Sequence, residues 1–473
     1  CRIDKNRKAE DRIEREGMGW GRPEKFMDNP QLVCVNEEDS DQGGFGSNDV
    51  CQGALGDCWL LAAMTVVALH PEYMEKVMDR KGNIERQKKG YFAVNIFTAG
   101  RFEQVLVDST ILCTKTGNQR KPFRPMFVTA RDKNELWPMI LEKAYARHHD
   151  SFEAINGGFV HKGLMDFTGG FGTDIDLQEC QVDINSGALF KKLLGYKASG
   201  FLMGAGSPSG SDSDTSTTGI VQGHAYAILN IVEESDSNGT HQLLCLRNPW
   251  GQSEWNGAWS DNDRARWTTR MKQKLNFTSE DDGKFWMSFQ DFTQNYARVY
   301  LCKTFKLKKD GGSFYYTKNT AFWKNADKTA GGAPTSKNKN CHRNPSFIIK
   351  PSRPCTIYVS VQQYGLNGHS ESDQYQAAFL LKKRGKRVKG LYRGDKIASS
   401  GSFTNVHMAT FEAKIEPYDR GYTLYCAAYK EGVEAQLSVR VYSDAPLLDV
   451  DYDVDEPKLY ELPLSAPIDN GRD

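Results

Sequence analysis

The sequence lacks three features that would each assign it to a broad class of protein. Its 473 residues carry 61 Lys and Arg against 60 Asp and Glu, so the near-zero net charge of +1 argues against chain-wide binding of nucleic acid. No apolar run reaches the ~18 residues of a membrane-spanning helix; the longest, Trp59 to Leu69, is interrupted by Thr65. The eleven cysteines form no CxxC pair, which disfavours structural zinc and a disulfide scaffold.

What is present is the composition of a globular protein. Hydrophobic residues make up 39% and aromatic residues 11%, enough to bury real cores. At ~150 residues a domain, the length predicts roughly three domains. Scattered free thiols suit a reducing compartment, so we expect a cytoplasmic location. Because the first residue is Cys1, we expect a piece of a longer chain, and that parent chain could be attached to a membrane.

Residue patterns predict both helices and strands. Helices are expected over 58–69, 136–147 and 187–194, and strands over 91–97 and 104–107. Short β-type runs between turn signals fill residues 313–443, which favours a β-sandwich. The stretch 446–473 is rich in acidic residues and proline and is expected to be a tail or linker.

One cysteine stands in a setting that favours reactivity. A glycine loop, Gln52–Asp57, delivers Cys58 to the first turn of an apolar helix. The positive end of a helix dipole stabilises a thiolate there. The amide of Gln52 is placed to donate to an oxyanion beside the backbone N–H of Cys58. The alternative is that Cys58 is a small buried hydrophobic residue, as most free cysteines are.

A hairpin supplies the expected partners of this thiol. Strand-like runs follow His224 and precede Asn248, and the Asn238-Gly239 turn joins them. Pairing about residue 236 or 237 sets position 224 against about position 249, so His224 and Asn248 are expected side by side. The Asn side-chain oxygen can then hold one imidazole N–H and aim the other nitrogen at a thiolate. The alternative for a strand histidine is a purely structural role.

These blocks resemble a known protease family. Gln52–Ala63 (QGALGDCWLLAA), Gly223–Ile228 (GHAYAI) and Asn248–Gly251 (NPWG) are similar to the three active-site blocks of calpains, and 166–170 and 285–289 are also calpain-like. The resemblance runs from about Trp20 to residue 443. It implies that Cys58 is the nucleophile, His224 the base, Asn248 the orienting residue and Gln52 an oxyanion donor. It also implies a cleft lined by Gly223 and Trp250, with Trp250 shielding the His224–Asn248 pair from water.

The implied fold class is α+β: a papain-like protease core of two subdomains followed by an antiparallel C2-like β-sandwich. The expected boundaries are a lead-in over 1–20, a Cys subdomain over 21–197 and a His and Asn subdomain over 198–305. The sandwich is expected over 312–445 and the acidic tail over 446–473. The polar segment 207–219, just before His224, resembles the family's gating loop.

The resemblance also implies two calcium sites built from oxygen ligands. The first would use carbonyls of Gln42 and Gly44 with the carboxylate of Asp49, and the second Glu254, Asp261 and Asp282. An arginine near Asp49 links the two sites in the family, and that position is Ser47 here.

Two lysines stand where calpains usually keep calcium-binding acids. They are Lys162, upstream of the 166–170 block, and Lys284. An ammonium cannot ligate calcium but can pair with the leftover carboxylates. We therefore hypothesise that the lysines partly replace the ions and weaken calcium dependence. The alternative is a misalignment of a few residues.

The expected partners are protein substrates. The basic run 382–389 is either a solvated hairpin tip or a contact with anionic lipid. No EF-hand loop pattern follows residue 443, so a penta-EF-hand heterodimer is not expected. The function expected is limited proteolysis by an intracellular cysteine endopeptidase. The alternative is a non-catalytic calpain-like scaffold that binds partners or membranes through the sandwich. Asn248 disfavours a transglutaminase, which usually orients its histidine with Asp.

Overall fold

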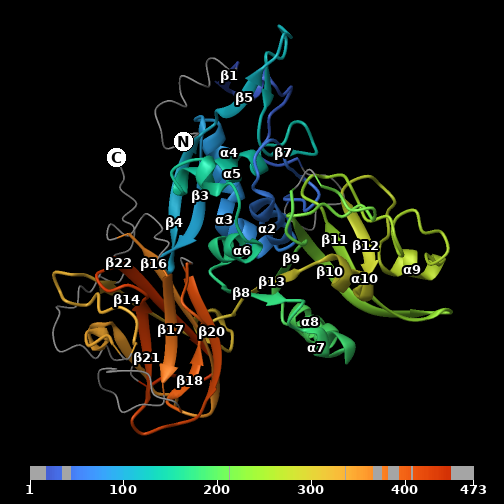
Figure 1. Ribbon diagram of the computed structural model, residues 1–473. Coiled ribbons are helices and arrows are strands. Elements are labelled where there is room, and N and C mark those ends of the chain that lie inside the picture. Colours follow the sequence, from blue (N-terminus) through green and yellow to red (C-terminus); the bar gives the residue numbers. More distant parts are fainter. Residues whose placement is uncertain are drawn as a thin grey trace. The chain divides into compact units, whose positions relative to one another are not determined.

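The computed structural model describes residues 17–34, 44–211, 214–335, 337–365, 375–381, 394–405 and 408–448. The chain divides into two compact units, Cys1–Thr304 and Phe305–Asp473 (Figure 1). The first unit mixes helices with antiparallel sheets, and the second is built mainly of antiparallel strands. The fold class is therefore α+β. In the described part of the chain, no helix is both long and apolar enough to cross a membrane.

The first half of unit 1 surrounds one buried helix, α2 (Cys58–Ala68). Every α2 residue after Cys58 is buried, which confirms the expectation that this helix is apolar all round and enclosed. Its neighbours are α3 (Pro71–Met78), α4 (Arg80–Gln87), α5 (Trp137–His148), α6 (Val160–Thr168), the 3₁₀ turns η1 (Pro23–Lys25) and η3 (Glu153–Ile155), and strands β1 (Met18–Gly21), β2 (Val50–Cys51), β3 (Tyr91–Thr98), β4 (Arg101–Asp108), β5 (Ile111–Lys115), β6 (Phe123–Pro125) and β7 (Thr129–Ala130).

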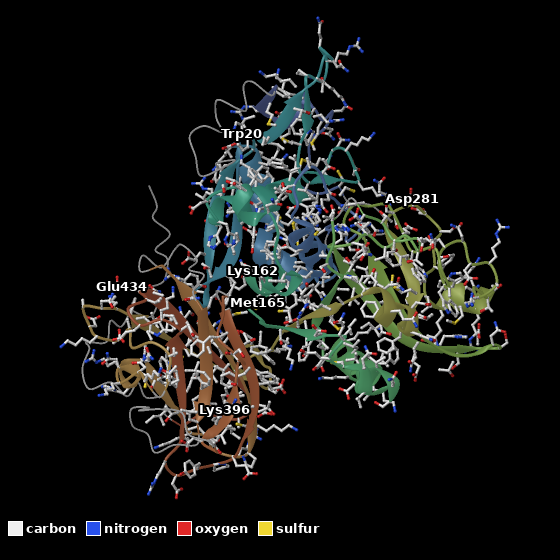
Figure 2. All side chains as sticks on the ribbon, in the orientation of Figure 1. Trp20, Lys162, Met165, Asp281, Lys396 and Glu434 are labelled. Atoms are coloured by element: carbon white, nitrogen blue, oxygen red, sulfur yellow. The ribbon has the colours of Figure 1, made fainter. Side chains whose placement is uncertain are left out.

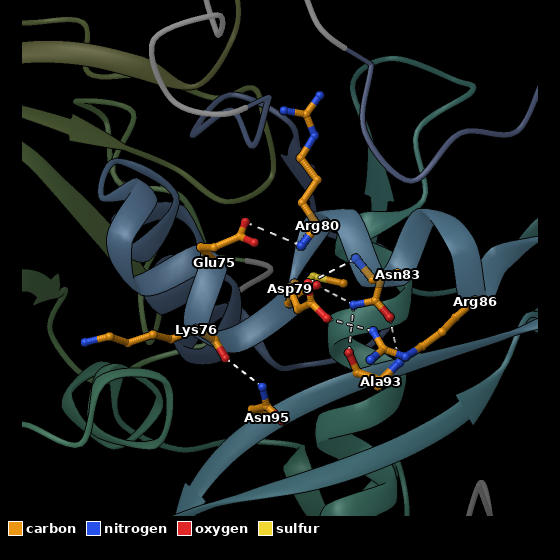
Figure 3. A network of polar contacts seen from close by, with 10 residues as sticks. Glu75, Lys76, Asp79, Arg80, Asn83, Arg86, Ala93 and Asn95 are labelled. Carbon is orange, nitrogen blue, oxygen red and sulfur yellow. Dashed lines mark hydrogen bonds and ion pairs between the residues drawn. The ribbon is translucent and has the colours of Figure 1, made fainter. Parts of the chain in front are cut away.

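A polar network fastens α4 to strand β3 (Figure 3). The carboxylate of Asp79 accepts from the backbone N–H of Gly82 at 3.0 Å and so caps α4. Arg86 also binds Asp79, at 3.0 Å. The buried side chain of Asn83 exchanges two hydrogen bonds of 2.8 Å with the backbone of Ala93. The network satisfies polar groups that would otherwise be buried without partners.

The second half of unit 1 is a six-stranded antiparallel sheet in the order β12-β11-β10-β9-β13-β8. Its elements are β8 (Phe171–Asp176), α7 (Gln181–Asn185), α8 (Ala188–Ala198), β9 (Leu202–Gly206), β10 (Ala225–Asp236), β11 (Gly239–Arg247), α9 (Thr269–Lys274), β12 (Lys284–Ser288), α10 (Phe289–Asn295) and β13 (Arg298–Lys303).

Packing assigns β8 and α8 to this second half. Strand β8 pairs with β13 over its whole length, and Phe190 and Leu193 of α8 share a core with Tyr226 and Leu246 of the sheet. The boundary expected at 197/198 would separate these elements from their sheet. The chain therefore passes between the halves of unit 1 near residue 170.

Unit 2 is a β-sandwich. One sheet has the order β14-β22-β16-β20, and the other β15-β21-β17-β18 with β19 beside β17. Side chains from both sheets, such as Trp323, Val359 and Leu424, form one core. The elements are η4 (Lys308–Asp310), β14 (Tyr315–Trp323), η5 (Cys341–Arg343), β15 (Ser346–Ile349), β16 (Cys355–Tyr364), β17 (Tyr375–Leu381), β18 (Lys396–Ser399), β19 (Thr404–Asn405), β20 (Met408–Ile415), β21 (Tyr422–Ala428) and β22 (Ala435–Ser443).

Several sequence predictions fall outside the described residues. They are most of the lead-in 1–20, the basic run 382–389, Gln42 and the greater part of the tail 446–473.

Candidate active site

The loop before α2 is held by the backbone of neighbouring segments. The N–H of Gln52 donates to the carbonyl of Pro249 at 2.9 Å, and the N–H of Ala54 to Met126 at 3.0 Å. A side chain at Gly53 would come within 2.2 Å of the Phe127 carbonyl, so only glycine fits there. The loop delivers Cys58 to the first residue of α2, where it is the only α2 residue that is not fully buried.

His224 and Asn248 form a buried pair. The His224 Nε2 lies 2.9 Å from the Asn248 Oδ1, and the two residues are 3% and 0% exposed. The amide orientation is fixed, because Asn248 Nδ2 donates to the Ser253 carbonyl at 3.0 Å and Oδ1 accepts the Trp250 N–H at 3.0 Å. His224 Nε2 must therefore carry the proton it shares with Asn248.

The expected hairpin produces this pair. Strands β10 and β11 pair from Asp236 and Gly239 back to Ala227 and Arg247. A β-bulge near Leu229 shifts the register by one residue at the open end. The ring of Trp250 lies 5.0 Å from that of His224, centroid to centroid, so Trp250 packs against the histidine of the pair.

Cys58 and His224 line one cavity of about 450 Å³. It is bounded by residues from both halves of unit 1, including Gly158, Phe159, Ser207, Gly223 and Tyr300. Burial raises the pKa of the Tyr300 hydroxyl to about 12, and the nearby Cys58 adds to the shift. The structure thus brings the cysteine, the histidine and Gly223 to a single cleft.

Gln52 lies on the other side of the loop, beside Trp250. Both line a second cavity of about 320 Å³, together with Gly53 and Gly56. The Gln52 Nε2 donates to the Leu55 carbonyl at 2.7 Å, and its Oε1 has no hydrogen-bond partner among the described residues. The amide therefore keeps one N–H for a further acceptor.

The chain was compared with known proteins. Residues 4–303 match the model of the calpain family cysteine proteases. The chain belongs to the calpain family. It is 36% identical to the calpain-type cysteine protease ADL1 of Oryza sativa over 86% of its own length and 18% of the relative's. It is 35% identical to the calpain-type cysteine protease DEK1 of Zea mays, over 90% of its own length and 20% of the relative's. It is 33% identical to the mouse calpain-2 catalytic subunit over 73% and 49%.

The matched part of these calpains is limited. The chain spans about a fifth of the length of the plant relatives and about half of calpain-2. In the described residues, no three His, Cys, Asp or Glu side chains are arranged to hold a metal ion.

The first expected site contains a buried carboxyl pair that sequence reasoning missed in part. Asp49 Oδ2 accepts from the Gly46 N–H at 2.7 Å and from Trp137 Nε1 at 3.1 Å. Burial raises the pKa of Asp49 and, with the charge of Asp49, raises the pKa of Glu135 to about 10. Such a pair takes up either a proton or a cation, and its oxygens suit calcium. Glu135 could have been suspected from its place beside the apolar Leu136-Trp137.

The three acids of the second expected site lie near enough for their charges to interact, although they do not form a group of three placed to hold a metal ion. Glu254 Oε1 accepts the N–H groups of Asp282 and Gly283 at 3.1 and 2.8 Å. Both Asp261 oxygens are buried without a hydrogen-bond partner in the described ranges. Burial, then the charges of Glu254 and Asp282, raise the pKa of Asp261 to about 7, and the charge of Lys284 opposes the shift. Lys284 thus neutralises part of this acidic cluster.

Lys162 acts elsewhere than hypothesised. It lies on α6, and its Nζ binds Asp166 Oδ2 at 2.9 Å and the Tyr145 hydroxyl at 3.0 Å (Figure 2). The spacing of four residues places Lys162 and Asp166 on one face of the helix. Lys162 therefore neutralises Asp166, and the hypothesis that it pairs with the carboxylates at Asp49 finds no support in these contacts.

The structure adds polar residues next to the triad. Asp57, directly before Cys58, contacts Glu142 of α5, and the two are 0% and 2% exposed. Arg247, directly before Asn248, is buried and donates from Nη2 to the Asn48 carbonyl at 2.9 Å. Both are visible in the sequence only as charged residues inside apolar segments, which is a weak signal.

Proposed function

We propose that this chain is the catalytic part of a calpain-type cysteine endopeptidase that performs limited proteolysis of protein substrates. The observation that carries the proposal is the buried His224–Asn248 hydrogen bond of 2.9 Å, with His224 and Cys58 on one cleft. We further propose that the two halves of unit 1 are the papain-like subdomains and that unit 2 is the family's C2-like sandwich. The antiparallel two-sheet architecture supports the latter.

The proposed chemistry follows from the tautomer of His224. Its Nε2–H is held by Asn248, so Nδ1 is the nitrogen that accepts the thiol proton of Cys58. The thiolate attacks the peptide carbonyl, and the Cys58 N–H with Gln52 donates to the oxyanion. The imidazolium then protonates the leaving amine. Water, deprotonated by His224, attacks the thioester and releases the acid and the free thiol.

We propose that calcium, when bound, is held by the oxygens of Gly44, Asp49 and Glu135 in one half and of Glu254, Asp261 and Asp282 in the other; Gln42 is a further expected ligand. Burial and, after it, repulsion between neighbouring acids raise the pKa of Glu135 and Asp261, and a bound cation would oppose both effects. We propose that Lys284 partly replaces the ion at the second site, so that some activity persists without calcium.

Hydrolysis of an unstructured peptide tests this function. The chain and its Cys58→Ser variant are assayed with excess chelator and with added calcium. We expect hydrolysis that Cys58→Ser reduces by several orders of magnitude, as removal of a triad member does. Residual turnover under chelator is expected from Lys284; complete loss, restored by calcium, contradicts that part alone. No turnover in either buffer contradicts the protease proposal and favours the scaffold.

A further inference from the structure

The turn 280–283 fixes the backbone of Asn248. The Asn248 N–H donates to the Gly283 carbonyl at 2.9 Å. Gly283 has a φ of +80°, and a side chain there would come within 2.7 Å of the Asn248 carbonyl oxygen. The turn and Asn248 are therefore in direct contact, and a displacement of one must displace the other.

One arginine reaches this turn from the other half of unit 1. Arg131 follows β7, and its backbone N–H donates to the Asp49 carbonyl at 2.9 Å. Its Nη2 lies 3.0 Å from Glu280 Oε2, and its Nη1 lies 3.5 Å from Asp282 Oδ2. A single residue thus joins the Asp49 segment to the turn that supports Asn248.

The two ion pairs differ in burial. The side chain of Glu280 is 62% exposed, so its pair with Arg131 contributes little by itself. The side chain of Asp282 is 3% exposed, and a buried carboxylate needs a nearby cation. Arg131 supplies that charge from its half-exposed position at the edge of the turn.

Other charges near the turn do not make the same connection. Lys284 follows the turn on the same strand and pairs in register with Arg247, so both belong to the second half of unit 1. Arg247 binds the Asn48 carbonyl from a fully buried position. Among the described residues, Arg131 is the cation of the first half that forms ion pairs with this turn.

We propose that Arg131 is a positioning residue for catalysis. It holds the turn 280–283 through Asp282, the turn holds Asn248, and Asn248 orients His224 toward Cys58. Arg131 thereby replaces, with a cation built into the chain, part of the connection between the two acidic loops. The inference rests on the proposed protease function and adds the residue that couples the two halves of its active site.

The test compares Arg131→Gln with the wild type in peptide hydrolysis under chelator. Because Arg131 is not among the residues that line the cavity of Cys58 and His224, we expect kcat to fall roughly tenfold while KM stays within about twofold, as small misplacements of catalytic groups do. Arg131→Lys, which keeps the charge, is expected to restore at least half of the loss. Arg124→Gln, at an exposed arginine without an ion pair among the described residues, is the matched control.

Salt provides a readout that a merely structural role would not move. Because Arg131 is 45% exposed, its ion pairs are screened by ions. Wild-type kcat is expected to fall as the ionic strength is raised. The kcat of Arg131→Gln is expected not to depend on ionic strength, and the melting temperature of this variant is expected to stay close to that of the wild type. An unchanged kcat in Arg131→Gln, or an effect on KM alone, overturns the inference. A wild type that is inactive both with chelator and with added calcium instead overturns the proposed function, so the two failures are distinct. Where only calcium supports turnover, the same comparison of variants is made with calcium.

Discussion

At the residue scale, two buried acids lie beside Cys58: Asp57, which directly precedes it, and Glu142, which pairs with Asp57. Burial raises the pKa of Asp57 to about 7, and the pKa of Glu142 is raised further by burial and by the charge of Asp57. Glu142 also accepts the Val128 N–H at 3.1 Å. Two buried carboxyls this close cannot both be charged, so the pair keeps at least one proton near neutral pH. The pair fixes the start of α2 through a neutral acid instead of a salt bridge.

This pair makes folding depend on pH. Unfolded carboxyls lose their protons near pH 4, whereas the folded pair keeps at least one proton to pH 7 and above. The free energy of unfolding therefore falls as pH rises from about 4. Glu142→Gln removes the Glu142 proton, so its stability curve should be flatter between pH 5 and 8, by up to about 1.4 kcal/mol per pH unit.

Denaturant titrations of wild type and Glu142→Gln at several pH values measure this difference. Glu24→Gln, at an exposed glutamate, serves as the control and should follow the wild-type curve. If the slopes for Glu142→Gln and wild type are the same, Glu142 holds no extra proton in the folded protein, and the account of a proton kept by the pair is wrong.

At the element scale, the hairpin was the part of the site best predicted from sequence. The Asn238-Gly239 turn fixes the register, and the apolar runs on either side of it identify the strands, so proximity of His224 and Asn248 followed without a structure. The bulge near Leu229 could not be predicted, because it depends on packing of the strand against its neighbours. The helix α2 was equally clear, since its ten consecutive buried residues, Trp59 to Ala68, form an almost unbroken apolar run in the sequence.

Other elements depended on long-range contacts that the sequence does not encode locally. Glu135 meets Asp49 across a separation of 86 residues, whereas Lys162 meets its partner Asp166 locally, within its own helix. Alignment by motif alone placed Lys162 at the first calcium site. That placement was misleading, because the acidic partner of Asp49 lies before α5 and not in α6. The place of strand β8 in the second sheet was also not predictable from the local sequence, because its partner β13 is more than a hundred residues away along the chain.

The loop before α2 provides a test at this scale. Gly53→Ala introduces a methyl group 2.2 Å from the Phe127 carbonyl, so the loop carrying Gln52 must move. We expect kcat/KM to fall at least tenfold and stability by roughly 1–3 kcal/mol, as overpacking does. Gly117→Ala, where nothing lies within 4 Å of the added methyl, is the matched control and should be near neutral. Equal activity in both variants would show that the loop's close packing does not position the site.

At the scale of the whole molecule, the residues proposed to be catalytic all lie in unit 1, Cys1–Thr304. Cys58 and His224 come from different halves of that unit, and the Arg131 ion pairs and the Gln52–Pro249 hydrogen bond are among the contacts that join the halves. Unit 2 has a core of its own. Unit 1 is therefore expected to activate one thiol, that of Cys58, above the other cysteines of the chain.

Labelling of the full chain with a thiol-directed peptide-like electrophile, mapped by mass spectrometry, tests that claim most directly. Cys180 is a suitable internal reference, because it is partly exposed and its pKa is raised by burial. We predict that Cys58 reacts at least a hundredfold faster than Cys180, on the order expected for an activated thiolate, and that His224→Ala removes the difference. Labelling of Cys58 no faster than Cys180, with chelator and with calcium alike, would contradict the account.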